Sequence, residues 1–266
     1  MRIVAIGDPH GNLARLKRMP LKGADLILVT GDLGDSDLMR KRAFESIRRQ
    51  KKGLPPIEYC AAQHKQAFMQ AFTSSVRVMR YLAKFAPVYT IYGNVESSDR
   101  ETKEYARALG LPLPSLSQAL RKIPGVHVVG HKLVRFRGLR IGALDYFVDK
   151  NWVETFVGKK KSLLLKSAAL QSAQARTLLS KWGRVHILLC HQPPFGVLDK
   201  VNSHAAPKHW RGKRAGSKTI LDYIKKKRPA FVFCGHIHEA HGMKKIGTST
   251  VYNLGNGSHA IIETLP

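Results

Sequence analysis

The 266 residues are 44% hydrophobic and 24% charged, which is ordinary for a globular protein and excludes disordered, collagen-like and coiled-coil chains. The charge balance is unusual, because 45 Lys and Arg residues against 18 Asp and Glu residues give a formal net charge of +27. A field of this size attracts polyanions, so we expect non-specific nucleic-acid binding through a basic surface. A surface adapted for solubility would carry the same charge, and the sequence leaves both interpretations open.

The cysteines and the apolar runs bear on the compartment. Cys60, Cys190 and Cys234 form no CxxC pair and are odd in number, which favours a reducing environment. No apolar run is long enough to cross a bilayer, and the chain reaches a polar motif by Asp8, earlier than a signal peptide would allow. We therefore expect a cytoplasmic protein without a membrane span.

Short runs rich in β-branched residues predict buried strands, in chain order at Arg2–Ile6, Leu26–Thr30, Val88–Tyr92, Val185–Leu189 and Ala230–Phe233. Helical spacing of apolar residues separates them, at Phe68–Ala83, Leu164–Ser172 and Thr219–Lys227. Strands that alternate with helices favour an α/β fold with a largely parallel core.

Two stretches depart from this alternation of strand and helix. Residues 126–147 alternate apolar and polar side chains around Arg137-Gly138, which predicts an antiparallel ribbon, and residues 243–262 predict strands and turns. We predict one domain over residues 1–266, with basic helical and loop insertions around 36–85, 150–182 and 203–216.

Polar residues follow each of the five predicted strands. They are Asp8 and His10, Asp32 and Asp35, Asn94, His191, and His236 with His238. Because the carboxyl ends of the strands in an α/β sheet form the ligand crevice, we expect these side chains to converge on one site. Carboxylates, imidazoles and an amide suit divalent Mn, Fe, Zn, Ni or Mg. Without Asp35, these residues make seven candidate ligands, which suit two ions that share a bridging carboxylate, and Asp32 is the central candidate for the bridge.

These blocks resemble the calcineurin-like metallophosphoesterase family in type and in order: Asp8-x-His10, Gly31-Asp32-x-x-Asp35, Gly93-Asn94, His191 and Gly235-His236-x-His238. The resemblance implies an α/β/β/α sandwich of four layers, with two sheets face to face and helices outside. It implies one metal held by Asp8, His10, Asp32 and His238, and a second held by Asp32, Asn94, His191 and His236. A metal-bridging hydroxide would then attack phosphorus in line, with Asn94 on the substrate phosphate.

Val95 departs from the family pattern, which has a histidine that protonates the leaving oxygen at this position. General acid catalysis contributes about 10²–10⁴-fold, so its loss disfavours substrates with poor leaving groups. We therefore predict a phosphodiesterase in which Asp32, Asn94 and His191 are catalytic. His241, which closely follows His238, is the candidate substitute acid, although a surface histidine is the simpler interpretation. The alternatives are a phosphomonoesterase that uses such a substitute, and a catalytically weak metal-site scaffold that binds protein or nucleic acid.

Neighbouring residues receive structural interpretations. Asp35 is predicted to orient the Asp32 loop, Asn12 to cap a helix near Leu13 or to serve the site, and Glu96 to act at a helix N-terminus. Cys190 and Cys234 are predicted core residues.

The loop Lys208–Arg214 either holds phosphates and stacks a base on Trp210, or uses Trp210 to cover a hydrophobic edge. The cations between Arg40 and Lys52 are predicted to form a solvated helix face.

Overall fold

The computed structural model describes residues 1–157, 162–204 and 206–264, and it arranges their strands in two sheets. The first sheet has the order β11-β1-β2-β3-β4, and the second has the order β5-β6-β7-β8-β10-β9. The strands of the first sheet are β1 (Arg2–Ile6), β2 (Leu26–Val29), β3 (Val88–Thr90), β4 (Val126–Val128) and β11 (His259–Glu263). Those of the second are β5 (Lys132–Phe136), β6 (Leu139–Leu144), β7 (Ile187–Cys190), β8 (Phe231–Cys234), β9 (Gly242–Ile246) and β10 (Ser249–Asn253).

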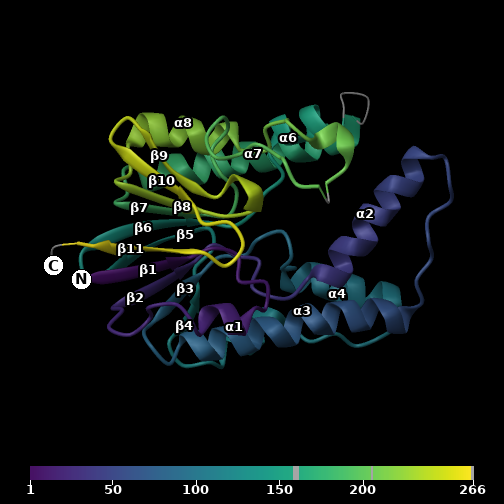
Figure 1. The fold of residues 1–266 in the computed structure, drawn as a ribbon, viewed down its shortest axis with the longest axis horizontal. Coiled ribbons are helices and arrows are strands. Elements are labelled where there is room, and N and C mark those ends of the chain that lie inside the picture. The colour runs from purple at the N-terminus through teal and green to yellow at the C-terminus, as the bar shows by residue number, and fades with distance from the viewer. Residues whose placement is uncertain (158–161, 205, 265–266) are drawn as a thin grey trace.

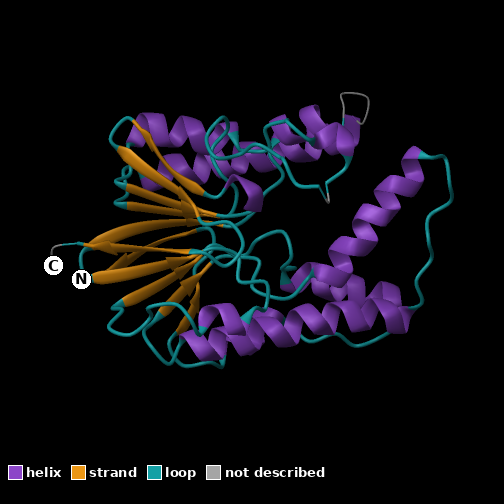
Figure 2. Ribbon diagram, viewed as in Figure 1, coloured by secondary structure: helices purple, strands orange, loops and turns teal. Residues whose placement is uncertain are grey.

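Helices cover the outer face of each sheet (Figure 1), and the strands lie between the two helical layers (Figure 2). The first sheet is covered by α1 (Leu13–Leu16), α3 (Ala61–Leu82) and α5 (Leu116–Arg121), and the second by α7 (Ser162–Trp182) and α8 (Lys218–Lys227). The remaining helices are α2 (Asp37–Lys51), α4 (Asp99–Leu109), α6 (Lys150–Phe156) and the short 3-10 turns η1 (Lys208–Trp210) and η2 (His238–Ala240). The structure therefore confirms the predicted α/β/β/α sandwich.

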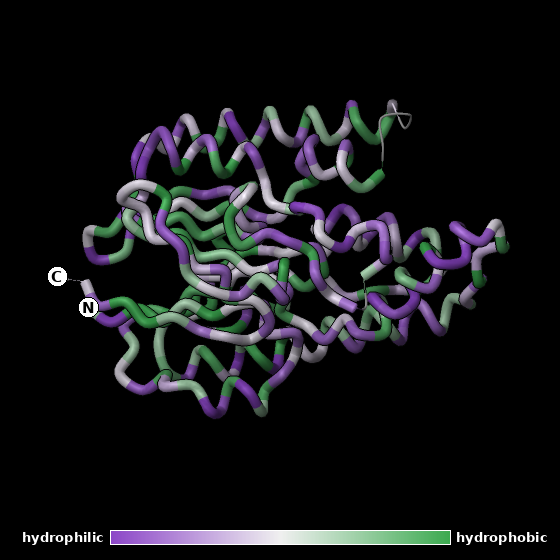
Figure 3. Tube along the Cα trace, turned by 45° about the horizontal axis from the view of Figure 1, so that its top comes forward, coloured by the Kyte–Doolittle hydropathy of each residue, from purple (hydrophilic) through white to green (hydrophobic). Residues whose placement is uncertain are grey.

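The alternation of side chains along each strand produces three hydrophobic layers. In β1, Val4 and Ile6 pack toward α1 and α3, whereas Ile3 and Ala5 face the second sheet. Both sets are fully buried, which explains why the strands read as continuous apolar runs rather than as alternating ones. The strands form the most hydrophobic part of the chain trace (Figure 3).

The five predicted strands are confirmed, with shifts of one or two residues at their ends. The predicted ribbon over residues 126–147 is confirmed only in part. β5 and β6 pair antiparallel through Arg137-Gly138, both at positive φ, but β4 pairs parallel with β3 in the other sheet. The chain therefore crosses from the first sheet to the second between Val128, where β4 ends, and Lys132, where β5 begins.

Helix α2 stands apart from the two helical layers (Figure 1). No residue of α2, which the structure describes throughout, is fully buried, so the predicted solvated basic helix is confirmed. The predicted insertions around 150–182 and 203–216 include residues 158–161 and 205, which lie outside the described residues. Among the described helices, none is long and apolar enough to span a membrane.

Candidate metal centre

The predicted ligands meet where strands of both sheets end. Asp8 and His10 follow β1, Asp32 follows β2 and Asn94 follows β3, all in the first sheet. The second sheet contributes three imidazoles, from His191 at the end of β7 and from His236 and His238 after β8. Parallel strands place all of these loops at one edge, which is why residues more than 200 positions apart become neighbours.

Four of these residues form a group that can hold a metal ion: Asp8, His10, Asp32 and His238 each offer an atom within 4.8 Å of the others. The His238 Nε2 atom lies 3.3 Å from Asp8 Oδ2 and 3.2 Å from His10 Nε2. Two imidazole nitrogens at this separation, beside carboxylate oxygens, have the geometry of ligands that share a cation.

The other three predicted ligands form a second group. The Asn94 side-chain oxygen lies 3.0 Å from His191 Nε2 and 2.8 Å from His236 Nδ1. The opposite ring nitrogen of His191, Nδ1, donates to the backbone oxygen of Thr30 at 2.8 Å. With Nδ1 donating to this carbonyl, Nε2 is the ring nitrogen that would coordinate a metal beside the Asn94 oxygen.

Asp32 lies between the two groups. Its Oδ2 is 3.7 Å from His10 Nε2, and its Oδ1 is 3.7 Å from His191 Nε2. The backbone N–H of Val95 donates to Oδ1 at 3.0 Å, which fixes the direction of the carboxylate. One carboxylate thus presents a different oxygen to each set of imidazoles.

Buried polar partners hold the carboxylates. The Thr30 hydroxyl donates to Asp8 Oδ1 at 2.6 Å, and the N–H of His236 donates to Asp8 Oδ2 at 2.5 Å. Glu96 accepts from the backbone N–H groups of Asp32, Leu33 and Gly93 at 2.7–2.9 Å. The predicted role of Glu96 at a helix N-terminus is wrong, because α4 begins at Asp99 and the carboxylate binds the loops after β2 and β3 instead.

The backbone at the site is held in an uncommon conformation. Three of the predicted ligands, His10, Asp32 and His236, have φ of 43°, 47° and 68°. Non-glycine residues in this region are strained, and such strain gathers at functional sites. Gly93 and Gly235 allow the loops to close, because a Cβ at Gly93 would collide with Asp32 Oδ1 and a Cβ at Gly235 with Asp8 Oδ1.

The electrostatics of the site favour a bound cation. Burial acts to raise the pKa of Asp8, but the imidazoles of His191, His238 and His10 outweigh burial and hold it below its ordinary value. Burial acts to lower the pKa of His191, but Asp32 and Asp8 outweigh it and raise the value. Carboxylates that attract a proton onto a buried imidazole also attract a metal ion.

The pKa of His236 is shifted in the direction opposite to that of His191. Burial, followed by the charge of His191, lowers it to about 3. The ring is therefore neutral over the physiological range, as a metal ligand must be. Burial lowers the pKa of His10 in the same way.

A cleft of about 420 Å³ opens over the ligands. One side carries an aromatic cluster in which Trp210 meets Trp152 and Phe156 with ring centroids 5.9 and 5.2 Å apart. The opposite side is α2, which contributes Arg40 and Phe44. This aromatic cluster could not be predicted from the sequence, because its rings come from α6 and η1, which only the fold brings together.

The structure also bears on the predicted roles of Asn12, Asp35 and His241. The Asn12 side chain accepts from the Arg15 N–H at 3.0 Å, so its capping role is confirmed. The Asp35 carboxylate accepts from the Asp37 N–H and from Gln70 Nε2, which ties the Asp32 loop to α3 as predicted. His241 is exposed, with Nε2 3.0 Å from the Ser258 hydroxyl, and its role as substitute acid stays a prediction.

The cysteines beside the ligands are core residues, as predicted. The Cys190 and Cys234 side chains are fully buried, and burial raises the pKa of both thiols. Both pack in the hydrophobic layer between the second sheet and its helices. They are therefore unsuited to redox chemistry at the site.

In the basic loop Lys208–Arg214, the packing favours the predicted role in which Trp210 covers a hydrophobic edge over the role in which it stacks a base. Trp210 packs on the aromatic cluster, and Arg211 and Lys213 donate to the backbone oxygens of His204 and Thr155. Arg214 pairs with Asp199 at 2.9 Å. These cations are engaged within the protein, and nucleic-acid binding stays a prediction.

Two packed sheets with a cluster of carboxylates and imidazoles at one edge define a metal-binding protein of the α/β/β/α class. The family model described as calcineurin-like phosphoesterase matches residues 1–240, and the chain belongs to this family. The carboxylates, imidazoles and amide of the site fit this family, because nitrogen and oxygen ligands of this kind bind divalent metals.

Curated relatives are consistent with the family. A UPF0046 protein from Caenorhabditis elegans is 24% identical over 267 residues, covering 95% of this chain and 55% of its own. The human metallophosphoesterase domain-containing protein 1 is 35% identical over 85 residues, covering 30% of this chain and 24% of its own. The chain thus spans about half the length of the first relative and a quarter of the second.

Solved structures share the fold. One has a TM-score of 0.59 at 16% identity and covers 98% of this chain and 94% of its own. A phosphopantetheinyl hydrolase from Mycobacterium tuberculosis has a TM-score of 0.56 at 11% identity and covers 96% of this chain and 89% of its own. At these identities the likeness concerns the fold alone.

Proposed function

We propose that the protein is a phosphoesterase that depends on two divalent metal ions and favours phosphodiesters. The observation that carries the proposal is Asp32, whose two oxygens face two separate sets of imidazoles. A carboxylate in this position is suited to bridging two ions about 3.5–4 Å apart. Family membership supports hydrolysis of phosphoesters in general, and the diester preference rests on this chain's own residues.

In this proposal, Asp8, His10, Asp32 and His238 would hold one metal, and Asp32, Asn94, His191 and His236 the other. Bound divalent metals of the predicted kind (Mn, Fe, Zn or Ni) polarise phosphoryl oxygens and lower the pKa of water. The chain's own contribution is orientation. Thr30 fixes Asp8 through its hydroxyl and His191 through its carbonyl, so one residue aligns a ligand of each sheet.

The cleft adds groups that suit an anionic ester. Arg40 lines it and presents a guanidinium, which matches the geometry of phosphate oxygens. The Asn94 amide lies at the floor beside His236, where a phosphoryl oxygen can accept from it. These groups bind and orient an ester without changing protonation state.

Val95 supports the preference for diesters. Its backbone N–H serves Asp32, while its side chain lines the cleft where a general acid would stand. Valine donates no proton, so the leaving group must depart as a stable anion. Activated diesters meet this condition, and alkyl monoesters do not.

The test is hydrolysis of bis(p-nitrophenyl) phosphate and of an alkyl monoester, ethyl phosphate, by chelator-treated protein, each with added Mn²⁺, Ni²⁺, Zn²⁺ or Mg²⁺. We expect turnover that requires added metal and a higher kcat/KM for the diester. Turnover that persists after chelation contradicts the metal mechanism, and a wide preference for the alkyl monoester contradicts the argument from Val95. Metal binding without any turnover would favour the scaffold alternative.

A further inference from the structure

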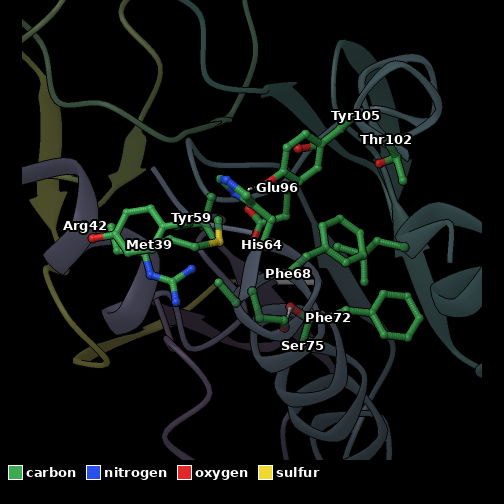
Figure 4. A pocket seen from close by; sticks show the side chains of 15 residues that line it. Met39, Arg42, Tyr59, His64, Phe68, Phe72, Ser75, Glu96, Thr102 and Tyr105 are labelled. Carbon is green, nitrogen blue, oxygen red and sulfur yellow. Dashed lines mark hydrogen bonds between the residues drawn. The ribbon is translucent and has the colours of Figure 1, made fainter. Parts of the chain in front are cut away.

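A second cavity, of about 390 Å³, is drawn with its lining side chains in Figure 4. It is lined by α2, α3, α4 and the segment that follows β3, and its volume falls in the range of small-molecule sites. Met39 and Val95 line both this cavity and the metal cleft, so the two spaces share a wall. The same Val95 binds Asp32 through its N–H, which places the shared wall directly at the centre of the site.

Aromatic rings dominate the lining of this cavity. Tyr59, His64 and Tyr105 form a chain of edge-to-face contacts, with centroids 6.0 and 5.9 Å apart. Phe68 and Phe72 of α3 stack at 6.3 Å on another part of the lining. The labelled side chains project into a common space (Figure 4). Such a lining favours a ligand that is itself a ring.

Several polar groups of the lining already have partners within the protein. Tyr105 Oη lies 2.7 Å from His64 Nδ1, and Arg42 donates to the Gln63 carbonyl while its guanidinium covers the Tyr59 ring at 4.3 Å. Glu96 accepts three backbone N–H groups. The cavity therefore offers ring faces and apolar surface for the most part, which favours a ring over a second phosphate as its occupant.

We propose that this cavity is the subsite for an aromatic leaving group, so that the substrate is an aryl phosphodiester. The inference rests on the proposed phosphoesterase function and adds its substrate class. It also accounts for Val95: a phenol has a pKa near that of tyrosine, about 10, and its anion leaves without a general acid. The apolar side chain of Val95 at the boundary of the two spaces suits a neighbouring ring, whereas the missing histidine would place a polar group there.

The reaction balances without a further reactant. An oxygen of water forms the new bond to phosphorus, and the bond between phosphorus and the aryl oxygen breaks. The aryloxide leaves with the bonding electron pair. One water proton stays on the new phosphate hydroxyl, and the other passes to solvent, from which the aryloxide is protonated.

The experiment compares two unreactive analogues in which a CH₂ group replaces the ester oxygen: monomethyl benzylphosphonate and monomethyl ethylphosphonate. Their affinities for the Mn²⁺-loaded protein are measured by calorimetry. We expect the benzyl compound to bind about tenfold to a hundredfold more tightly, as burial of one ring predicts. Equal affinities, or no binding of either compound, overturn the proposal.

A variant that fills the cavity identifies the site. Ala67 is buried on α3 and lines the cavity, and Ala62 is exposed on the same helix. Ala67→Phe should reduce the affinity ratio to about one and leave ethylphosphonate binding unchanged, whereas Ala62→Phe should keep the wild-type ratio. Should Ala67→Phe fail to fold, Ala67→Leu makes the same test with a smaller side chain. If filling the cavity at Ala67 leaves the ratio of the two affinities unchanged, the ring binds elsewhere and the assignment of this cavity as its subsite is overturned.

Hydrolysis of bis(p-nitrophenyl) phosphate by the wild type is measured separately. If no metal supports turnover but the benzyl preference persists and disappears in Ala67→Phe, the phosphoesterase function is contradicted while the aromatic subsite stands. If turnover is found without a benzyl preference, the function stands and the subsite is overturned.

Discussion

The two sheets contribute different chemistry to one site. The first supplies both carboxylates and the amide, through Asp8, Asp32 and Asn94, together with His10. The second supplies only imidazoles, from His191, His236 and His238. Hydrogen bonds join the halves, from the His236 N–H to Asp8 and from His191 Nδ1 to the Thr30 carbonyl. The site therefore exists only when the sheets are packed, and each half can be altered separately.

The ligands contributed by the two sheets also differ in their electrostatics. In the first sheet, Asp8 keeps its negative charge, because the facing imidazoles lower its pKa despite its burial. On the second sheet, burial keeps His236 neutral. The anionic carboxylate of Asp8 on one side and the neutral ring of His236 on the other are suitable ligands for divalent cations.

Changing Asp32 to Asn removes the charge that both groups of ligands share. We expect metal-dependent diesterase activity to fall at least about 100-fold while the fold persists, because metals supply most of the transition-state stabilisation in such sites. Metal content and activity are measured together. Asp222→Asn, an exposed carboxylate on α8, is the matched control and should behave as the wild type. Full activity in Asp32→Asn contradicts the shared-ligand model.

Changing Glu96 to Gln tests the support of the first-sheet loops. Glutamine offers one acceptor oxygen in place of two, so at least one of the three N–H groups loses its partner. We expect a loss of about 1–3 kcal/mol in unfolding free energy and a metal affinity about 10–100-fold weaker. Denaturant unfolding and metal titration measure these quantities, with the exposed Glu104→Gln as control. Unchanged metal affinity would reduce Glu96 to a structural role.

Changing Val95 to His restores a proton donor at the wall of the cleft. We expect the ratio of monoester to diester kcat/KM to rise about tenfold or more, because alkyl monoesters gain most from protonation of the leaving oxygen. Val95→Leu, which adds bulk without a donor, should leave the ratio near the wild-type value. An equal rise in both variants would assign the effect to shape rather than to proton donation.

The pH dependence of stability tests the imidazole half in the metal-free protein. His236 stays neutral in the fold down to a pKa of about 3, but in the unfolded chain it protonates near its ordinary value of 6.5. The unfolded state thus binds more protons between these values, and stability falls as the pH falls below 6.5. From pH 7 to 5 the wild type should lose about 1–2 kcal/mol more than His236→Asn. Parallel stability curves for the two proteins would show that His236 titrates normally.

The sequence alone predicted what depends on local order along the chain. The strands, the polar residue after each and the ligand types follow from short-range patterns, and the resemblance assigned their grouping. The role of Glu96 was missed because its three donors lie on loops after two different strands. The aromatic cavity was missed for the same reason, since Tyr59, Phe68 and Tyr105 meet only through packing of α3 with its neighbours.

Crystals grown with Mn²⁺ and measured at the manganese absorption edge would show whether Asp32 bridges two metal ions. We expect two anomalous peaks about 3.5–4 Å apart, with one oxygen of Asp32 coordinating each ion or one oxygen shared by both. A single peak at saturating Mn²⁺, or two peaks that Asp32 does not contact, would contradict this bridging role.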